Sequence, residues 1–490
     1  MSISVSGGAG SFDAHLDDML AVSSIIKASG SSLRELSDDA ARASVNGSVL
    51  AAGLLCPVEL AAAEAAILRA TTGPDGLLPT GLALEGSGLL VEAAVTSYRV
   101  VDGVGRELLD HAQQVVGMVA GGVAVVGAIG AASYLVTHPL DLVLLLSQKD
   151  SLLASVQTTL FEHPWLMDAA TRLAPGFLQG ALMTGVGGFG ALMAGGSGGA
   201  GLNLALLWAA GGHWPTTDYE GSIAGLIALG QKFGYFHDVG DWPAVQVTDL
   251  PDDAIAPDGV RGIFEQQGSL GRQGSEGQVQ IVKVVDADGT TRWIVQIPGT
   301  QDWSPERTDN PVDLTTNVTL MSQEQRTAMQ REVERAMAAA GIGPNDEVML
   351  TGHSQGGITA AAIASDATIR DRFNVVSVVT GGSPIARMDI PDSVSVLSVE
   401  HAQDPVPKLD GATNPATDNW VTVHADVDAA AVSSRTGTAP TPGDAHGTNF
   451  YATTGQAIDS SSDPSATAWR DANAQFFNGT TTVTRWQISG

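Results

Sequence analysis

The sequence has a single cysteine, Cys56, among 490 residues, so an intramolecular disulfide framework and a cysteine-based zinc finger are excluded. Basic residues are also scarce: 24 Lys and Arg stand against 53 Asp and Glu, for a formal net charge of −29. Because this charge repels phosphate groups, we expect no nucleic-acid partner. The low cysteine content does not decide the compartment, since secreted proteins without disulfides exist.

Aromatic residues make up only 5% of the chain and charged residues 16%, whereas hydrophobic residues make up 44%. A chain with this balance builds a packed core and is not a disordered acidic tail. The first 18 residues carry neither a basic cluster nor an apolar segment. We therefore expect no secretory signal peptide, and export would use another route.

Composition divides the chain into three regions, of which residues 1–114 are expected to be all-helical. A pattern with helical spacing is predicted to stop at Gly30, because glycine is common just after a helix end. A second helix is predicted to start near Pro57 and to end at Gly73. A third helical pattern begins near Gly88.

The middle region, residues 115–217, is rich in glycine and alanine. Val115–Val136 is 22 residues without a charged side chain, long enough as a helix to cross a bilayer core of about 30 Å. Leu173–Thr217 also lacks Asp, Glu, Lys and Arg, and the spacing of Gly117 and Gly121 fits close helix packing. Two interpretations stay open, a membrane-inserting segment and a buried hairpin of small residues.

The C-terminal region, residues 218–490, alternates strand-like and helix-like segments, which predicts an α/β domain with a mainly parallel sheet. The turn Asp286–Gly289 separates two apolar runs and predicts a hairpin. A helix is predicted from Ser322 to Ala340, with Ser322 and Gln325 as a capping box and Gly341 as its stop. The further predicted strands are EVMLT, NVVSVVT and VSVLSVE, with an Ala-rich helix after the first.

The segment Gly352-His353-Ser354-Gln355-Gly356 matches G-x-S-x-G, in which the serine occupies a sharp turn between a strand and a helix. A strand pattern precedes it, a helix pattern follows it, and the glycines relieve crowding at the turn. The segment Gly195–Gly199 matches too, but Ser197 has no strand before it and is predicted to lie in a linker. We therefore predict that Ser354 is a nucleophile.

A serine nucleophile needs a base, and in an α/β-hydrolase the acid and then the histidine follow the serine along the chain. Asp404 follows a predicted strand and is the preferred acid, with Asp410, deeper in the loop, as the alternative. His446 lies in a glycine-containing loop and is the preferred base. His424 lies in an alternating strand pattern and is the alternative base.

Two further histidines lie near these positions. His353 is expected to pack beneath the serine, and His401 precedes the acid. The developing oxyanion also needs backbone N–H donors that are already in place. We predict that Thr300, in the turn after strand RWIVQI, and Gln355, the residue after the serine, supply them.

The segments PGTQDW, TGHSQGG and DPVP, followed by a late histidine, resemble the class-three lipases, the fungal-lipase-like α/β-hydrolases. The resemblance covers roughly residues 275–455. It implies an α/β-hydrolase fold, with Thr300 in the oxyanion turn and Ser354, Asp404 and His446 as the catalytic triad.

Two positions depart from the family pattern. Pro298 stands where the family has arginine, so the support of the oxyanion turn differs. Gln355 stands where leucine is usual, with little consequence because the main-chain N–H is the donor. The sequence contains neither a metal-binding cluster nor a dinucleotide fingerprint, so no cofactor and no metal are expected.

Near the end of the N-terminal helical region, Tyr98-x-x-x-Asp102 resembles the Y-x-x-x-[DE] export signal of actinobacterial type VII secretion substrates, although no W-x-G motif occurs. The resemblance implies a secreted or cell-surface protein that contacts a secretion machinery. A cytoplasmic location is the alternative.

Taken together, these patterns predict a serine hydrolase that cleaves carboxylic esters, a lipase or esterase with a lipid-like substrate. One alternative is an acyltransferase with the same triad, in which an alcohol displaces water. The other is a secreted membrane-active or interaction protein that contacts a membrane through residues 115–217.

Overall fold

The computed structural model describes residues 3–7, 16–44, 56–72, 76–100, 116–118, 157–168, 171–174, 176, 213, 216, 218–238 and 240–490. Contacts divide the chain into two units, Phe12–Leu109 and the combination of Met1–Ser11 with Asp110–Gly490. The prediction that residues 1–114 are all-helical is wrong at its start. Ile3–Ser6 is strand β1, and it pairs with a strand of the C-terminal region.

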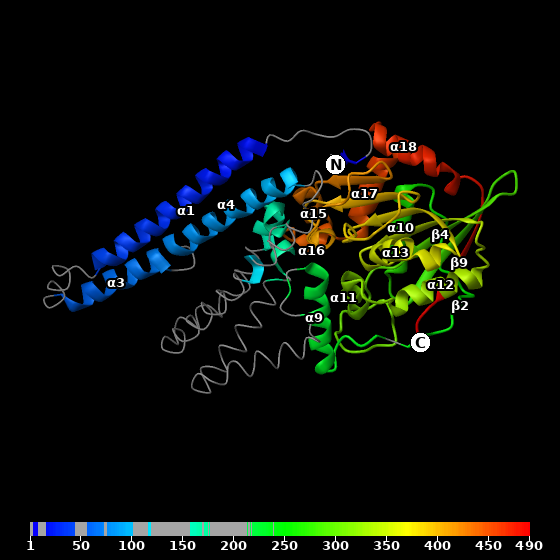
Figure 1. The fold of residues 1–490 in the computed structure, drawn as a ribbon, viewed down its shortest axis with the longest axis horizontal. Coiled ribbons are helices and arrows are strands. Elements are labelled where there is room, and N and C mark those ends of the chain that lie inside the picture. The colour runs from blue at the N-terminus through cyan, green and yellow to red at the C-terminus, as the bar shows by residue number, and fades with distance from the viewer. Residues whose placement is uncertain are drawn as a thin grey trace. The chain divides into compact units, whose positions relative to one another are not determined.

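The described helices of the unit Phe12–Leu109 are α1 (Leu16–Ser44), α3 (Pro57–Thr72) and α4 (Leu77–Val100) (Figure 1). The predicted start at Pro57 is confirmed, but Gly30 does not end a helix, because α1 continues past it. A Cβ atom at Gly30 would lie 2.5 Å from the carbonyl oxygen of Gly81 in α4. The glycine therefore permits close packing of α1 and α4.

The other unit is built on a nine-stranded sheet in the order β1-β8-β7-β6-β5-β4-β3-β9-β2. Strands β4 to β8 pair in parallel, as predicted, while β1 at one edge and β3, β9 and β2 at the other pair antiparallel. The predicted hairpin is confirmed as β3 and β4. The strands are β1 Ile3–Ser6, β2 Val245–Gln246, β3 Gln278–Val285, β4 Thr291–Ile297, β5 Glu347–His353, β6 Asn374–Gly381, β7 Ser395–His401, β8 Trp420–Ala425 and β9 Thr480–Gln487.

Helices cover both faces of this sheet, and each strand therefore buries successive side chains on opposite sides. On β4, Val295 belongs to the core with α12 and α13, whereas Ile294 belongs to the core with α10 and α17. The helices are α9 Tyr219–Lys232, α10 Val260–Leu270, α11 Leu314–Ser322, α12 Ala328–Ala340, α13 Gln355–Ser365, α14 Ala367–Arg370, α15 Ala429–Thr436, α16 Pro442–Ala445, α17 Thr448–Asp459 and α18 Pro464–Asn473, with short 3₁₀ turns at Val406–Lys408 and Ala474–Phe476.

The helix predicted from Ser322 to Ala340 starts later than expected, because Ser322 is the last residue of α11 and α12 begins at Ala328. The predicted capping box is therefore wrong. Thr327 and Gln330 form the capping box of α12. Gly341, with φ of 88°, ends this helix as predicted.

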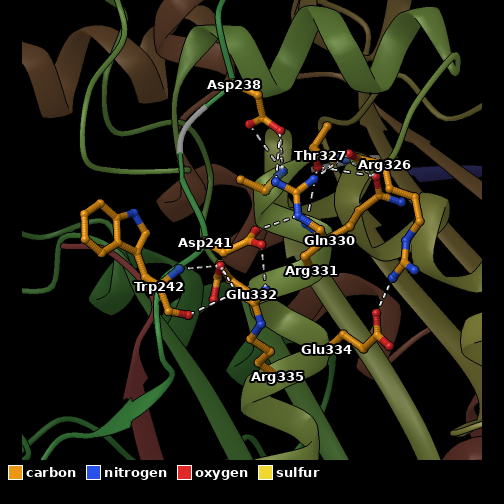
Figure 2. A network of polar contacts seen from close by, with 11 residues as sticks. Asp238, Asp241, Trp242, Arg326, Thr327, Gln330, Arg331, Glu332, Glu334 and Arg335 are labelled. Carbon is orange, nitrogen blue, oxygen red and sulfur yellow. Dashed lines mark hydrogen bonds and ion pairs between the residues drawn. The ribbon is translucent and has the colours of Figure 1, made fainter.

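An ion-pair network fixes the chain that leads into β2 against α12 (Figure 2). The Arg331 guanidinium lies 3.2 Å from a carboxylate oxygen of Asp238 and 2.8 Å from one of Asp241. The main-chain N–H of Trp242 donates to Glu332, whose pKa is raised by burial. These charges are paired with one another, so we interpret the network as structural.

Within the described ranges, no helix is long and apolar enough to cross a membrane. The uncharged segment Val115–Val136, apart from residues 116–118, lies outside those ranges, as do most of Leu173–Thr217 and the second serine motif at Ser197. The membrane interpretation of this middle region stays a prediction.

Candidate active site

Ser354 occupies the turn between β5 and α13 with φ of 55° and ψ of −126°. A positive φ is unfavourable for a residue with a side chain, so this turn is strained and must be held by its surroundings. The N–H of Ser354 donates to the carbonyl oxygen of Gly381 at 2.9 Å, and the Ser383 hydroxyl donates to the Ser354 carbonyl oxygen at 2.8 Å. Neighbouring β6 and the loop after it thus anchor the strained residue.

The glycines of the motif are required because neighbouring backbone atoms lie too close to leave room for a side chain. A Cβ atom at Gly352 would lie 2.1 Å from the carbonyl carbon of Gly356, and one at Gly356 would lie 2.0 Å from the carbonyl oxygen of Ile297. Any larger residue would push the start of α13 away from β4. The sequence motif therefore describes a steric requirement of this turn.

The predicted acid and the predicted base meet in the structure. His446 Nδ1 lies 2.7 Å from Oδ2 of Asp404, which follows β7. The Tyr451 hydroxyl donates to the same oxygen at 2.6 Å, and the N–H of Val406 donates to Oδ1 at 2.9 Å. Asp404 is fully buried, whereas the His446 side chain is 20% exposed.

Burial by itself would raise the pKa of Asp404, but the His446 charge and the hydrogen bonds from His446, Tyr451 and the Val406 N–H hold this pKa below its ordinary value. The carboxylate therefore stays ionised. The pKa of Tyr451 is raised well above its ordinary value by burial and by the Asp404 charge. Its hydroxyl therefore keeps its proton and acts as a donor.

Ser354 and His446 belong to one cluster, although no hydrogen bond between their side chains is present in the described part of the chain. His353, which directly precedes the serine, has its ring centroid 4.4 Å from that of His446. A Cβ atom at Gly382 would lie 3.0 Å from His446 Cε1 and 2.8 Å from Asp404 Oδ2. Catalytic hydrogen bonds are often long in ligand-free structures and shorten when substrate binds.

The alternative acid, Asp410, is engaged elsewhere. Its Oδ2 accepts the N–H of Ala386 at 2.8 Å, and its Oδ1 accepts the N–H of Ala412 at 3.1 Å. Burial raises the pKa of Asp410 to about 6. These contacts brace two loops against each other.

The alternative base, His424, lies on β8 and faces a different set of side chains. Its Nδ1 is 3.6 Å from Glu400 Oε2, and its Nε2 is 3.3 Å from the Ser6 hydroxyl on the edge strand β1. Burial is the main cause that raises the pKa of Glu400 to about 8. The structure thus pairs His424 with Glu400 and His446 with Asp404.

The predicted oxyanion donors lie on the segments that meet at the serine. A Cβ atom at Gly299 would be 3.3 Å from Ser354 Cβ, so the turn that carries Thr300 packs against the serine. The Thr300 hydroxyl oxygen accepts a hydrogen bond from Asn317 Nδ2 at 2.8 Å, which leaves its hydrogen free to donate. Gln355 is the first residue of α13, where a helix N–H has no intrahelical partner.

Sequence reasoning missed three residues that support this cluster, namely Asn317, Ser383 and Tyr451. Tyr451 lies 47 positions from Asp404 along the chain. Asn317 lies 17 positions from Thr300. No local pattern links such pairs, and Asn317 does not stand out in α11, which also contains three threonines and a serine.

Two predictions concern features away from this cluster. The backbone of Tyr98 lies in α4, whereas Asp102 lies outside the described residues, so the export motif stays a prediction. Among the side chains that the structure describes, no group of three or more His, Cys, Asp or Glu is arranged to hold a metal ion.

A family model described as lipase (class 3) matches residues 287–414. This range includes Thr300, Ser354 and Asp404 and ends before His446. The match supports a lipase-type serine hydrolase that acts on ester substrates, and it implies an α/β-hydrolase fold for this part of the chain. No curated protein and no solved structure matches the chain.

Proposed function

We propose that the chain is a carboxylic ester hydrolase in which Ser354 is the nucleophile, His446 the general base and Asp404 the residue that orients the base. The observation that carries this proposal is the 2.7 Å contact between His446 Nδ1 and a buried, ionised Asp404 beside a strained serine turn. This combination supplies the base that a serine hydroxyl needs to become a nucleophile.

The reaction begins with the tautomer of His446. Its Nδ1–H donates to Asp404, so Nε2 is left without a proton and accepts the one from the Ser354 hydroxyl during attack on the ester carbonyl. The N–H groups of Thr300 and Gln355 stabilise the oxyanion that develops. His446 then returns the proton to the leaving alcohol, and water hydrolyses the acyl-enzyme by the same steps in reverse.

The test is Ser354→Ala, assayed with a fluorophosphonate probe and with p-nitrophenyl esters. The variant should lose labelling, and turnover should fall by about 10⁴- to 10⁶-fold, because a triad acts as a unit. Ser197→Ala is the matched control, since Ser197 lies in a second G-x-S-x-G match and should leave both signals intact. Full activity of Ser354→Ala would overturn the proposal.

We extend the proposal to lipid-like esters, since the matching family is described as lipases. A series of esters with increasing acyl length should show a preference for longer chains. The acyltransferase alternative is tested in the same assay by adding an acceptor alcohol. If ester formation with the alcohol outpaces release of free acid, the chain is an acyltransferase that uses the same serine.

The membrane-active alternative rests on the apolar middle region and is separable from catalysis. Liposome leakage that persists in Ser354→Ala would support it, whereas a protein that neither pellets with liposomes nor causes leakage would exclude it. The proposed partner is then a lipid bilayer contacted through residues 115–217.

Export is proposed from Tyr98 and Asp102 alone. Tyr98→Ala should trap active enzyme inside the producing cell, and unchanged secretion would remove the type VII interpretation. The catalytic proposal does not depend on this outcome.

A further inference from the structure

Two buried imidazoles hold two consecutive carbonyl groups on either side of His446. His401 Nδ1, at the end of β7, lies 2.7 Å from the carbonyl oxygen of Ala445. His353 Nε2, at the end of β5, lies 2.8 Å from the carbonyl oxygen of His446 itself. A carbonyl oxygen only accepts hydrogen bonds, so both ring nitrogens carry a hydrogen and donate it.

These two carbonyl groups are not used by the neighbouring helices. Helix α16 ends at Ala445 and α17 begins at Thr448, so His446 lies in the connection between them. The first residue of this stretch to accept bonds from α17 is Gly447, whose carbonyl oxygen accepts the N–H groups of Phe450 and Tyr451. The imidazoles therefore donate the hydrogen bonds that these two carbonyl groups do not receive from helix N–H groups.

Both imidazoles are held in one protonation state. Burial lowers the pKa of His353 to about 3 and the pKa of His401 to about 4. Each ring is therefore neutral near pH 7 and has one N–H to donate. Nε2 of His401 accepts from the Thr454 hydroxyl at 2.8 Å, and the ring stacks on Tyr451 with centroids 3.9 Å apart.

The two peptide groups that these imidazoles fix are the ones that flank the Cα atom of His446. The third fixed point is Nδ1 of His446, which is bonded to Asp404. Once both flanking peptides and one ring nitrogen are held, the position of Nε2 is determined. A displacement of about 1 Å at a reacting group costs up to about 100-fold in rate.

We infer that His353 and His401 are positioning residues that clamp the main chain on both sides of His446 and so aim its Nε2 at Ser354. The inference rests on the proposed role of His446 as the base. An uncharged donor suits this task, because the His353 ring lies 4.4 Å from the ring of His446. A charged group there would oppose the imidazolium that forms during the reaction.

The test exploits which ring nitrogen donates. The asparagine amide nitrogen occupies about the place of histidine Nδ1, and the glutamine amide nitrogen occupies about the place of Nε2. His401→Asn and His353→Gln therefore keep the donor, whereas His401→Gln and His353→Asn are matched isomers that misplace it. The first pair should keep turnover within about threefold of wild type, and the second pair should lose about 10- to 100-fold in kcat with little change in KM.

Active-site titration with a p-nitrophenyl phosphonate counts the folded sites, so kcat per site is compared even where a variant is less stable. The rate of phosphonylation of Ser354 should fall in parallel with kcat. His424→Gln serves as the control for loss of an imidazole outside the cluster and should leave both rates unchanged. Equal kcat per site in the variants that keep the donor and in those that misplace it would overturn the positioning role of His353 and His401.

Failure of the clamp and failure of the proposed function give different results. If His446→Ala retains full turnover, His446 is not the base and the proposed function assigns the wrong residue to that role. If His446→Ala is inactive while His353→Asn and His401→Gln are fully active per site, the assignment of the base is kept. Only the positioning role of the two imidazoles is then wrong.

Discussion

His446 and Tyr451 donate to the same carboxylate oxygen, Oδ2 of Asp404, at 2.7 and 2.6 Å. A single oxygen thus accepts one hydrogen bond from the proposed base and one from a phenol that keeps its proton. Hydrogen bonds to a charged acceptor are the stronger kind, and they keep Asp404 ionised in a fully buried position. Removal of either donor should therefore raise the pKa of Asp404 and loosen the position of its carboxylate.

Tyr451→Phe removes one of these donors without changing the ring. The loss of a hydrogen bond to a charged group is worth about 1.5–3 kcal/mol, so we expect kcat to fall by about tenfold or more and the free energy of unfolding to decrease. The measurements are ester turnover and urea denaturation. Tyr235→Phe is the control, because Tyr235 is 40% exposed and should change neither quantity.

The choice of base is tested by His446→Ala and His424→Ala. His446→Ala should lose nearly all turnover, at least about 10³-fold, and should remain folded because its side chain is partly exposed. His424→Ala should keep most of its activity and lose a little stability, because it removes the contacts with Glu400 and Ser6 and leaves the pair of His446 and Asp404 in place. Turnover and thermal unfolding measure both. Reversed phenotypes would make His424 the base.

Gly382→Ala tests how tightly the cluster is packed. Gly382 has φ of 61°, and a Cβ atom there would lie 2.8 Å from Asp404 Oδ2 and 2.9 Å from the Tyr451 hydroxyl. We expect a loss of about 2 kcal/mol or more in stability and a large loss of kcat. Gly289, with φ of 86°, has the same kind of backbone strain but open space around the Cβ position. Gly289→Ala should therefore lose less stability than Gly382→Ala, because backbone strain alone destabilises it. Equal turnover in the two variants would contradict the proposed packing.

The neutral imidazoles predict how stability changes with pH. The pKa of His353 is about 3 and that of His401 about 4 in the folded chain, against an ordinary value of 6.5. Below pH 6.5 the unfolded chain takes up protons that the folded chain does not, so the free energy of unfolding falls as pH falls towards 4. Between pH 7 and pH 5 each histidine should contribute a loss of about 2 kcal/mol.

The His353→Gln variant has no titrating group at this position. Between pH 7 and pH 5 its free energy of unfolding should therefore fall by about 2 kcal/mol less than that of wild type. Urea denaturation at pH 7 and pH 5 measures both losses. Identical losses in the two proteins would show that His353 titrates normally in the folded chain.

The predictions from sequence were accurate where the structure depends on near neighbours. The hairpin at Asp286–Gly289, the start of α3 at Pro57 and the end of α12 at Gly341 follow from turn chemistry and helix-terminus preferences that act within a few residues. The prediction of a helix end at Gly30 is wrong because a glycine does not only mark helix ends. Close packing of α1 against α4 also requires a residue without a Cβ atom.

What the sequence determined by itself is the serine turn. Its strand, its glycines and its helix are contiguous, and the crowding that demands the glycines arises largely between residues 352 and 357 and the adjoining end of β4. The order of serine, acid and histidine then limited the candidates to two acids and two bases. Only the tertiary structure shows which of these side chains lie in contact. It placed Asp404 beside His446 across 42 positions of chain and Glu400 beside His424 across paired strands.

The tertiary structure also decided which residues support the proposed base. Tyr451, His353 and His401 come from α17, β5 and β7, and their contacts exist only because the parallel sheet brings the ends of its strands to one edge. The pKa values of the two imidazoles depend on how much water the packed elements exclude. Burial of that kind is a property of the assembled fold, and no residue pattern along the chain encodes it locally.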